Sequence, residues 1–409
     1  MNLTTLFHAW PIAVLLTVCS AGWTPKSYRY EALPVDLRLQ VTEKGNEVSG
    51  YSAFRLPGHF TWGASVTRAD DGKYYMIYSA SEDGVYPFTD AWVLGSKMGL
   101  AVSDRPDGGF RHLGFFLNAD GFAPDTTAWD AQTVCNPHVR RFNGRYYLYY
   151  AGSADPADLT PQELRLPKRA RVQQSQCIGV IVFDRFTDLL KGRFSRSEQP
   201  LLRPRTRVKS GGVLRPSPAG TRALPDNLIA VNPSVVYRPS DGKYLLYFKG
   251  NLYDPHWRGV HGVAIADRPE GPFRPLDRPV FTLKGTDGKL SAEDPYVWYH
   301  PKDECFYAVF KDFGGQFTRG VPSLAVMASK DGIDWQLPQH SLFLPKQLTL
   351  TDGSVLKVDR LERPQLLIDD DGCPQVLYAA CSVGNLNPSK FGESFNVQIP
   401  IRTRPVAEP

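Results

Sequence analysis

The sequence has few of the features that mark several common protein classes. Its six cysteines contain no C-x-x-C pair, and five remain when Cys19 is set aside with the N-terminal segment. An odd number at such spacings argues against a zinc site and against a dense disulfide framework. The net charge of +5 is small for 409 residues, and no recognised nucleic-acid-binding motif occurs. We therefore expect neither a zinc-stabilised fold nor a nucleic-acid-binding protein.

An apolar run long enough to span a membrane is also missing. Residues 1–22, MNLTTLFHAWPIAVLLTVCSAG, have an apolar core from Pro11 to Val18 followed by small residues. This core is too short for a bilayer and is typical of a secretory signal peptide, although no Lys or Arg precedes it. We expect cleavage after Ala21, with lipidation at Cys19 as the alternative. The protein is therefore expected to be secreted or periplasmic, without a membrane span.

Glycine and proline, by contrast, are plentiful. The chain has 35 Gly and 34 Pro, with 42% hydrophobic and 12% aromatic residues. This composition indicates a globular protein with many turns. A closed β architecture can hold well over 200 residues around one core, so a second domain is compatible with the length but not required.

One hairpin pattern occurs five times along the chain. Each copy consists of a strand, a tight polar turn and an aromatic-rich strand. The copies are SVTRADDGKYYMIYSA from Ser65, PHVRRFNGRYYLYYAG from Pro137, PSVVYRPSDGKYLLYFKG from Pro233, PYVWYHPKDECFYAVFKD from Pro295 and PQLLIDDDGCPQVLYAAC from Pro364. A third strand and an Asp/Pro/Gly turn follow in LAVSDRPDGGFRHL from Leu100, VAIADRPEGPFRPL from Val263 and, more loosely, LAVMASKDGIDWQL from Leu324. Four antiparallel strands repeated five times predict an all-β fold, a five-bladed β-propeller.

Two further segments complete the predicted architecture of residues 23–409 as one propeller domain. The ring is expected to close when VDLRLQV, from Val35, supplies an outer strand beside FNVQIPI, from Phe395. The longest interval between hairpins contains Leu201–Arg222, which has six Lys and Arg residues and no acidic residue. We place this insertion at the rim, either as a solvated, mobile loop or as a contact for an anionic partner such as a uronic or sulfated glycan.

The innermost strand of every propeller blade starts at the same mouth of the central channel, so the residues before these strands converge. The expected starting positions are Ala64, Asn136, Asn232, Asp294 and Arg363, with Trp62, Gly63, Glu293 and Glu362 beside them. Neighbouring loops and strand ends are expected to add Asp130, Lys249, Lys311, Asp312, Tyr253, His256, Trp257 and His261. Carboxylates, amides, cations and indoles should therefore surround one pocket.

This set of side chains is suited to the cleavage of glycosidic bonds, which needs two carboxyl groups on opposite sides of the bond. Adjacent charges at Glu293 and Asp294 disfavour joint ionisation and so favour a proton donor. Arg363 can hold another carboxylate ionised. Flat apolar faces for a sugar ring are offered by Trp62, Trp129 and Trp257.

Each of these residues also has a structural interpretation. Asn-Pro and Asp-Pro pairs commonly start turns, so Asn136, Asn232 and Asp294 taken singly fit loop positions. Glu362 and Arg363 fit an ion pair between blades, and the tryptophans fit the core. His256 and His261 are a weak metal signal. The coincidence of polar groups at five equivalent positions favours a site.

At these residues the sequence resembles the five-bladed propeller glycoside hydrolases of families 43 and 117. The resemblance runs from about Phe60 to about Ser382 and includes SDRPDGGF, ADRPEGPF, EDPYVW and LERPQLL. It implies inversion, with an Asp base, an Asp that tunes the acid, and a Glu acid two positions before a proline. Glu293 matches the acid, and Glu362 matches it less closely. The Asp positions hold Ala64, Asn136 and Asn232 here, which leaves Asp130 as the nearest acidic substitute.

We therefore expect a secreted glycoside hydrolase that is exo-acting and inverting on an oligo- or polysaccharide. Glu293 is the expected acid, Asp294 its tuner, and Asp130 the base with Glu362 as substitute. The expected substrate contacts are Arg363, Asn136, Asn232, Trp62, Trp129, Lys249, His256, Trp257 and Lys311. No cofactor is expected to be required, although a carboxylate-lined mouth suits Ca²⁺. The alternatives are a non-catalytic glycan-binding propeller, and a lyase or transferase on the same scaffold.

Overall fold

A computed structural model describes residues 23–41, 48–117, 128–254, 256–283 and 292–406. The predicted signal peptide at residues 1–22, with Cys19, lies outside these residues. The helices of the described part are short: α1 (Phe88–Leu94), α2 (Lys168–Gln174), α3 (Phe186–Leu189) and a 3₁₀ turn at Glu163–Arg165. Among the described helices, none combines the length and the apolar character that crossing a bilayer requires.

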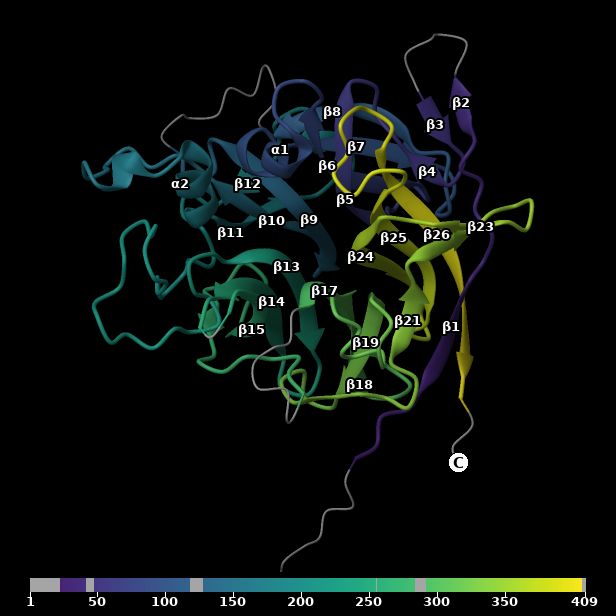
Figure 1. The fold of residues 1–409 in the computed structure, drawn as a ribbon. Coiled ribbons are helices and arrows are strands. Elements are labelled where there is room, and N and C mark those ends of the chain that lie inside the picture. The colour runs from purple at the N-terminus through teal and green to yellow at the C-terminus, as the bar shows by residue number, and fades with distance from the viewer. Residues whose placement is uncertain (1–22, 42–47, 118–127, 255, 284–291, 407–409) are drawn as a thin grey trace, which may run out of the picture.

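Five antiparallel sheets form the blades of a β-propeller, which confirms the predicted fold (Figure 1). Blade 1 consists of β5 (His59–Arg68), β6 (Tyr74–Glu82), β7 (Lys97–Ser103) and β8 (Arg111–Leu117). Blade 2 consists of β9 (Thr133–Phe142), β10 (Arg145–Ser153), β11 (Cys177–Phe183) and β12 (Ser195–Arg196). Blade 3 consists of β13 (Val231–Arg238), β14 (Lys243–Leu252), β15 (Arg258–Ala266) and β16 (Arg274–Pro275).

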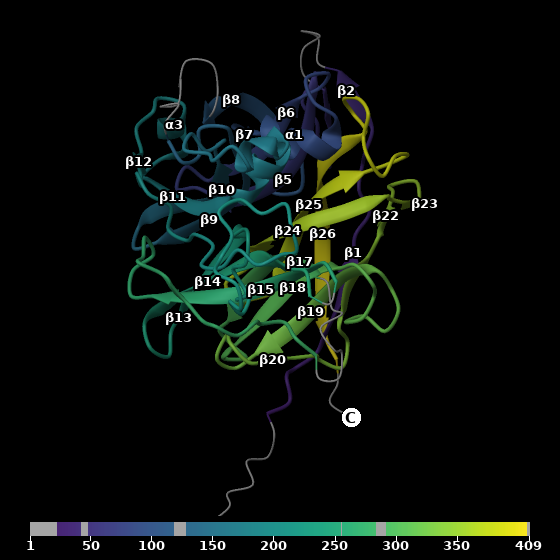
Figure 2. The same cartoon turned by 60° about the vertical axis from the view of Figure 1, so that its left-hand side comes forward.

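Blades 4 and 5 carry additional strands (Figure 2). Blade 4 consists of β17 (Ala292–His300), β18 (Cys305–Asp312), β19 (Ser323–Ser329) and β20 (Trp335–Gln336), and β21 (Leu342–Pro345) also pairs with β19. Blade 5 begins with β24 (Arg360–Ile368), β25 (Pro374–Ser382) and β26 (Ser394–Pro405). A separate hairpin joins β22 (Gln347–Thr349) to β23 (Val355–Lys357). All five predicted hairpins are therefore the two innermost strands of a blade.

The N-terminal segment closes the ring on blade 5, but with other strands than the sequence predicted. Both β1 (Tyr28–Ala32) and β4 (Ala53–Phe54) pair with β26, and β1 runs along it in Figure 1. Val35 instead forms a bridge to Leu350, while β2 (Leu39–Val41) pairs with β3 (Val48–Gly50). The prediction that the Val35 segment pairs with β26 is therefore wrong, although N-terminal closure itself is confirmed.

Every innermost strand is interrupted by a β-bulge at the same position. The pairing of the two inner strands shifts there in each blade. The bulged residues Gly63, Asn136, Asn232, Asp294 and Arg363 all have left-handed φ values between 48° and 60°. A non-glycine residue in this region costs about 1–3 kcal/mol and is found where the surrounding structure requires it. The equivalent position in blade 1 is therefore Gly63, and the predicted starting position Ala64 is wrong by one residue.

Side chains just beyond the bulges join each blade to the next. Backbone N–H groups of Val139, Val235 and Val297 donate to Ser65 Oγ, His138 Nε2 and Ser234 Oγ, each over 2.9 Å. The Tyr296 hydroxyl donates to the Leu366 carbonyl of blade 5 over 3.0 Å. These buried hydrogen bonds fix the blades around the channel, and hence the residues at its mouth.

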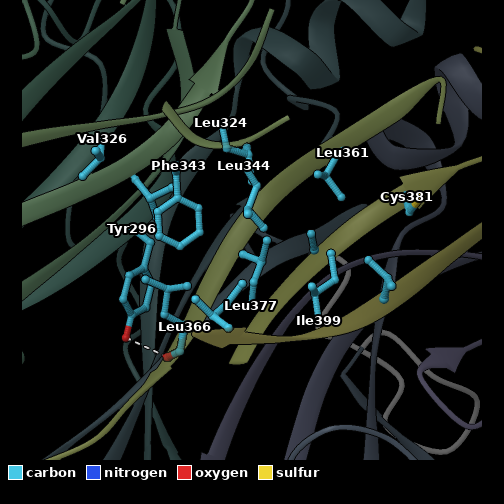
Figure 3. Packing of buried hydrophobic residues seen from close by; sticks show 14 of the residues in the cluster. Tyr296, Leu324, Val326, Phe343, Leu344, Leu361, Leu366, Leu377, Cys381 and Ile399 are labelled. Carbon is cyan, nitrogen blue, oxygen red and sulfur yellow. Dashed lines mark hydrogen bonds between the residues drawn. The ribbon is translucent and has the colours of Figure 1, made fainter. Parts of the chain in front are cut away.

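Apolar side chains fill the spaces between adjacent sheets. In the largest cluster, Tyr296 of blade 4 lies beside Leu366 of blade 5, and Leu324 and Leu377 belong to the same cluster (Figure 3). In blade 2, residues 146–150 are buried on both faces, with exposed fractions of 0 to 6%. The aromatic-rich second strand of this blade is therefore buried between neighbouring sheets, as its sequence predicts.

The basic insertion at Leu201–Arg222 is anchored to the propeller. Arg205 forms an ion pair with buried Asp226 at 2.8 Å, and Arg207 Nη1 donates to the Gln174 carbonyl over 2.6 Å. Leu214 is 2% exposed. Parts of the segment are therefore held against the propeller, while Arg203, Lys209 and Arg215 are exposed, as expected of a solvated loop.

Candidate active site

A cavity of about 370 Å³ lies at the mouth of the central channel, where the five innermost strands begin. The sequence-predicted residues that line it are Trp62, Asn136, Asn232, Lys249, Tyr253, Trp257, Glu293, Asp294, Glu362 and Arg363. The bulges bring the inner-strand residues of this set together because they aim equivalent side chains at the channel axis, whereas Lys249 lies on β14 and Trp257 in the loop that follows it. Residues up to 301 positions apart in the sequence, from Trp62 to Arg363, therefore share one cavity.

Four of the five bulged residues form a continuous hydrogen-bonded arc. Asn136 Nδ2 donates to Asn232 Oδ1, and Asn232 Nδ2 donates to Asp294 Oδ1, both over 2.6 Å. Arg363 completes the arc with Nη1 2.9 Å from Asp294 Oδ1, and its backbone N–H donates to Asp294 Oδ2. Gly63 fills the fifth position, where a Cβ atom would meet Arg363 Nε at 3.4 Å.

Asp294 is ionised in this arrangement. Burial alone would raise the pKa of its carboxyl group, but the charge of Arg363 and its hydrogen bond lower that pKa below the ordinary value. Both carboxylate oxygens accept hydrogen bonds. Asp294 is thus suited to holding the arc and Arg363 in place.

Two glutamates from adjacent blades are linked through one lysine. Glu293 forms an ion pair with Lys249, and its Oε2 lies 3.9 Å from Lys311 Nζ. Glu362 Oε1 lies 2.5 Å from the same Nζ and 3.1 Å from Arg360 Nη1. The positive charge of Lys311 offsets the repulsion between the two carboxylates and so allows them to face one cavity.

Four predicted site residues do not line the cavity. One of them, Lys311, lies behind Glu293 and Glu362 and contacts both, and the other three lie elsewhere. Asp130 is fully buried in blade 2, where it accepts a hydrogen bond from Tyr150 over 2.6 Å and lies 3.5 Å from Arg196 of the outermost strand β12. Trp129 stacks on Tyr150, with ring centroids 5.8 Å apart. Neither residue lines the cavity, and neither does the exposed His256. The loop before β9 therefore runs toward the rim, and placing Asp130 at the mouth was wrong.

Several residues that line the cavity were not found from the sequence. They are Phe60, Phe88, Trp92, Arg169, Gln173, Asn251 and Arg360. Phe88 and Trp92 belong to α1, and Arg169 and Gln173 to α2, so both helices form part of the wall. Arg360 alone had a usable signal, because it lies two positions before Glu362 and so follows the alternation of β24.

Aromatic rings form one side of the cavity. Phe88 makes edge contacts with Trp62 and Phe60, with ring centroids 5.1 and 5.5 Å apart. On another side, Lys249 Nζ lies 5.6 Å from the ring centre of Trp257, which is 48% exposed. Apolar faces combined with amides and charges are typical of sites for small polar ligands.

Positive charge is in excess around this cavity. The described residues provide the cations Arg169, Lys249, Arg360 and Arg363, with Lys311 in contact behind them, against the carboxylates Glu293, Asp294 and Glu362. The cation bound to Asp294 is the guanidinium of Arg363. Within the described residues, no group of three or more His, Cys, Asp or Glu side chains is arranged to hold a metal ion.

Comparisons with known proteins agree with this architecture. No family model matches the sequence. An extracellular endo-alpha-(1->5)-L-arabinanase of Bacillus subtilis (strain 168) is 39% identical over 234 residues, which are 56% of this chain and 39% of that protein. This chain therefore spans only about two-fifths of the length of the arabinanase.

Solved structures show the same fold at low sequence identity. A family 117 glycoside hydrolase from the marine bacterium Zobellia galactanivorans has a TM-score of 0.50 and 16% identity, covering 92% of this chain and 90% of that one. Another glycoside hydrolase has a TM-score of 0.56 and 12% identity, covering 90% and 92% of the two chains. The chain is thus a five-bladed propeller that resembles the propeller glycoside hydrolases in both sequence and fold.

Proposed function

We propose that the protein is a glycoside hydrolase that removes a terminal sugar from a glycan. The observation that carries this proposal is the pair of glutamates, Glu293 and Glu362, that face one cavity from adjacent blades and share Lys311. Hydrolysis of a glycosidic bond requires two such carboxyl groups. The similarity to the arabinanase supports the same reaction class.

In the proposed reaction, Glu293 is the general acid and Glu362 takes the role first given to Asp130. Glu293 donates a proton to the glycosidic oxygen as the bond to the anomeric carbon breaks. Glu362 accepts a proton from the water molecule whose oxygen attacks that carbon. Asp294 and Arg363 hold the floor of the site. Inversion is proposed from the family resemblance, and ¹H NMR of the first product anomer tests it.

The proposed exo action rests on the shape of the cavity. The hydrogen-bonded arc from Asn136 to Arg363 closes its floor. A volume of about 370 Å³ is near the lower end of the roughly 300–1,000 Å³ of small-molecule sites. Such a site suits one sugar ring held at its end.

An acidic sugar is the proposed terminal residue. Catalysis requires one of the two glutamates to carry a proton, which leaves Lys249, Lys311 and Arg360 around a single glutamate charge. A uronate carboxylate would supply the missing negative charge. Secretion is proposed from residues 1–22, in keeping with the extracellular location in the name of the arabinanase.

The test is to incubate the protein with arabinan, xylan, polygalacturonate and aryl glycosides of neutral and acidic sugars, and to measure released reducing ends and aryl groups. Wild type should release product from at least one substrate. The Glu293→Gln variant should lose about 10²- to 10⁴-fold in rate, the typical cost of losing a positioned acid, while unfolding at the same temperature. Full activity of Glu293→Gln would exclude the assignment.

A non-catalytic glycan-binding propeller is the second candidate. Gly63, Asn136 and Asn232 stand where the resemblance implies aspartates, and cations neutralise both glutamates. In that case the protein would bind a glycan of the panel and release nothing from any member.

A further inference from the structure

A second cavity, of about 420 Å³, lies directly beside the first one. Phe60, Phe88 and Thr89 line both, so the two cavities share a wall. Phe88 stands at this junction, because its ring contacts Trp62 on the side of the first cavity and lies 5.8 Å from the Arg360 guanidinium. The two spaces are therefore neighbouring parts of one surface depression.

Two loops that are distant in sequence build the second cavity and are tied together. One loop leads from β6 into α1, and the other joins β25 to β26. The Phe391 N–H of the second loop donates to Asp83 Oδ2 of the first over 2.7 Å. Asn387 Oδ1 accepts a hydrogen bond from Arg360 Nη2 over 3.0 Å, which links this wall to the ion pairs around Glu362. These hydrogen bonds hold the walls of the second cavity in a fixed arrangement at the channel mouth.

The chemistry of its lining suits a sugar. Val85, which is 58% exposed, and the half-buried Tyr86 present apolar surface. Asp83, Asn387 and Ser389 add oxygen and nitrogen atoms around that surface. An apolar platform bordered by hydrogen-bonding groups is what a pyranose or furanose ring needs, since one face of the ring is apolar and its edge carries hydroxyl groups.

We propose that this second cavity binds the sugar residues that adjoin the terminal one, on the leaving-group side of the bond that is cut. This inference rests on the proposed glycoside hydrolase function. The junction at Phe88 then lies near the scissile bond, and the natural substrate is an oligosaccharide of at least three sugars rather than a disaccharide. Affinity should consequently rise with chain length.

The test uses the Glu293→Gln variant, which prevents turnover, with Val85→Cys added and then blocked by N-ethylmaleimide. The adduct is uncharged and adds bulk at the lining of the second cavity, which does not include the two glutamates. Val355→Cys with the same treatment is the matched control, because Val355 is 56% exposed and belongs to the separate β22–β23 hairpin. Tyr86→Ala is a second variant that removes the platform instead of blocking it.

Calorimetric titration with tetragalacturonate and α-1,5-arabinotetraose, and with the corresponding disaccharides, gives the readout. The Val85 adduct and Tyr86→Ala should weaken tetrasaccharide binding about tenfold, roughly the loss of one good ring contact, and change disaccharide binding much less. Equal tetrasaccharide affinities for the Val85 and Val355 adducts would overturn the second site while leaving the hydrolase proposal intact. If Glu293→Gln without further changes bound none of these sugars, the second site would be overturned as a site for them, while the hydrolase proposal would stand or fall on product release from the substrate panel.

Discussion

Blades 2 and 3 differ from blades 4 and 5 at the channel mouth, although their backbones are equivalent. In blades 2 and 3 the bulged residue is an asparagine preceded by an apolar residue, as in Cys135-Asn136 and Val231-Asn232. In blades 4 and 5 both positions are charged, as in Glu293-Asp294 and Glu362-Arg363. The same bulge therefore provides a neutral half that orients hydrogen bonds and a charged half that is equipped for proton transfer.

The comparison also shows that the two halves depend on each other. Asp294 accepts hydrogen bonds from Asn232 on one side and from Arg363 on the other. The neutral half thus fixes the buried carboxylate that neutralises Arg363. Substitutions in the charged half should consequently lower the free energy of unfolding more than matched substitutions in the neutral half.

The largest difference in stability is expected between Asp294→Ala and Asn136→Ala. Removing Asp294 leaves the buried Arg363 charge without its partner, which costs about 3–5 kcal/mol of unfolding free energy. Removing the Asn136 amide leaves one buried oxygen of Asn232 unpaired, at about 1–3 kcal/mol. Urea unfolding of both variants and of wild type measures the difference. Equal losses would mean that the charged half has no special role in folding.

A smaller contribution to the free energy of unfolding, which depends on pH, is expected from His138, a buried residue of β9. Burial lowers its pKa to about 3, and the charges of Arg140 and Arg363 act in the same direction. The unfolded chain takes up this proton near the ordinary histidine pKa of about 6.5, so the contribution is full above that pH and is lost as the pH falls toward 3. Burial also lowers the pKa of His261 to about 3, so this residue adds to the same pH-dependent stability.

Between pH 3 and pH 6.5, the free energy of unfolding is expected to rise by about 1.4 kcal/mol per pH unit for each of these buried histidines. Urea unfolding at pH 7, 6 and 5 measures it. His138→Gln is the control, since it should reduce the slope by about 1.4 kcal/mol per pH unit whatever its effect at pH 7. An unchanged slope would contradict the burial of a neutral His138.

Gly63→Ala is expected to have a milder effect. Gly63 has φ 48°, a conformation that costs an alanine about 1–2 kcal/mol. The added Cβ atom would meet Arg363 Nε at 3.4 Å, which is an ordinary contact. Thermal unfolding should therefore show a modest loss with the site intact. A loss as large as that of Asp294→Ala would show that the fifth position cannot accept any side chain.

Removal of divalent cations is expected to have the smallest effect, in this case on hydrolytic activity. Arg363 already supplies the positive charge that Asp294 binds. Dialysis against EDTA should therefore leave activity on the best substrate unchanged. A loss that Ca²⁺ restores would show that a cation in the channel supports the site.

Much of this arrangement could be predicted because the hairpin repeat fixes which strand ends meet. Asn136, Asn232, Asp294 and Arg363 precede a proline in every case, which marks them as equivalent. Ala64 was misplaced because it occupies the proline position of blade 1, one residue after Gly63. The repeat thus predicted the residues on the inner strands.

The remaining site residues depend on paths that the repeat does not determine. Asp130 precedes an inner strand by only a few residues, yet its loop runs outward to Arg196. Arg169 reaches the mouth on α2, within an insertion between β10 and β11. The ring closes through β1 and β4 because both strands pair with the outer edge of β26 and so satisfy its backbone hydrogen-bonding groups. Such positions follow from tertiary packing rather than from local pattern.

The most direct test of the central claim compares initial hydrolysis rates of Glu362→Gln and Asp130→Asn with that of wild type. If the charged half of the mouth performs the reaction, Glu362→Gln should lose about 10²- to 10⁴-fold, and Asp130→Asn should stay within a few-fold of wild type at temperatures where both are folded. Loss of activity in Asp130→Asn together with an active Glu362→Gln would contradict the account.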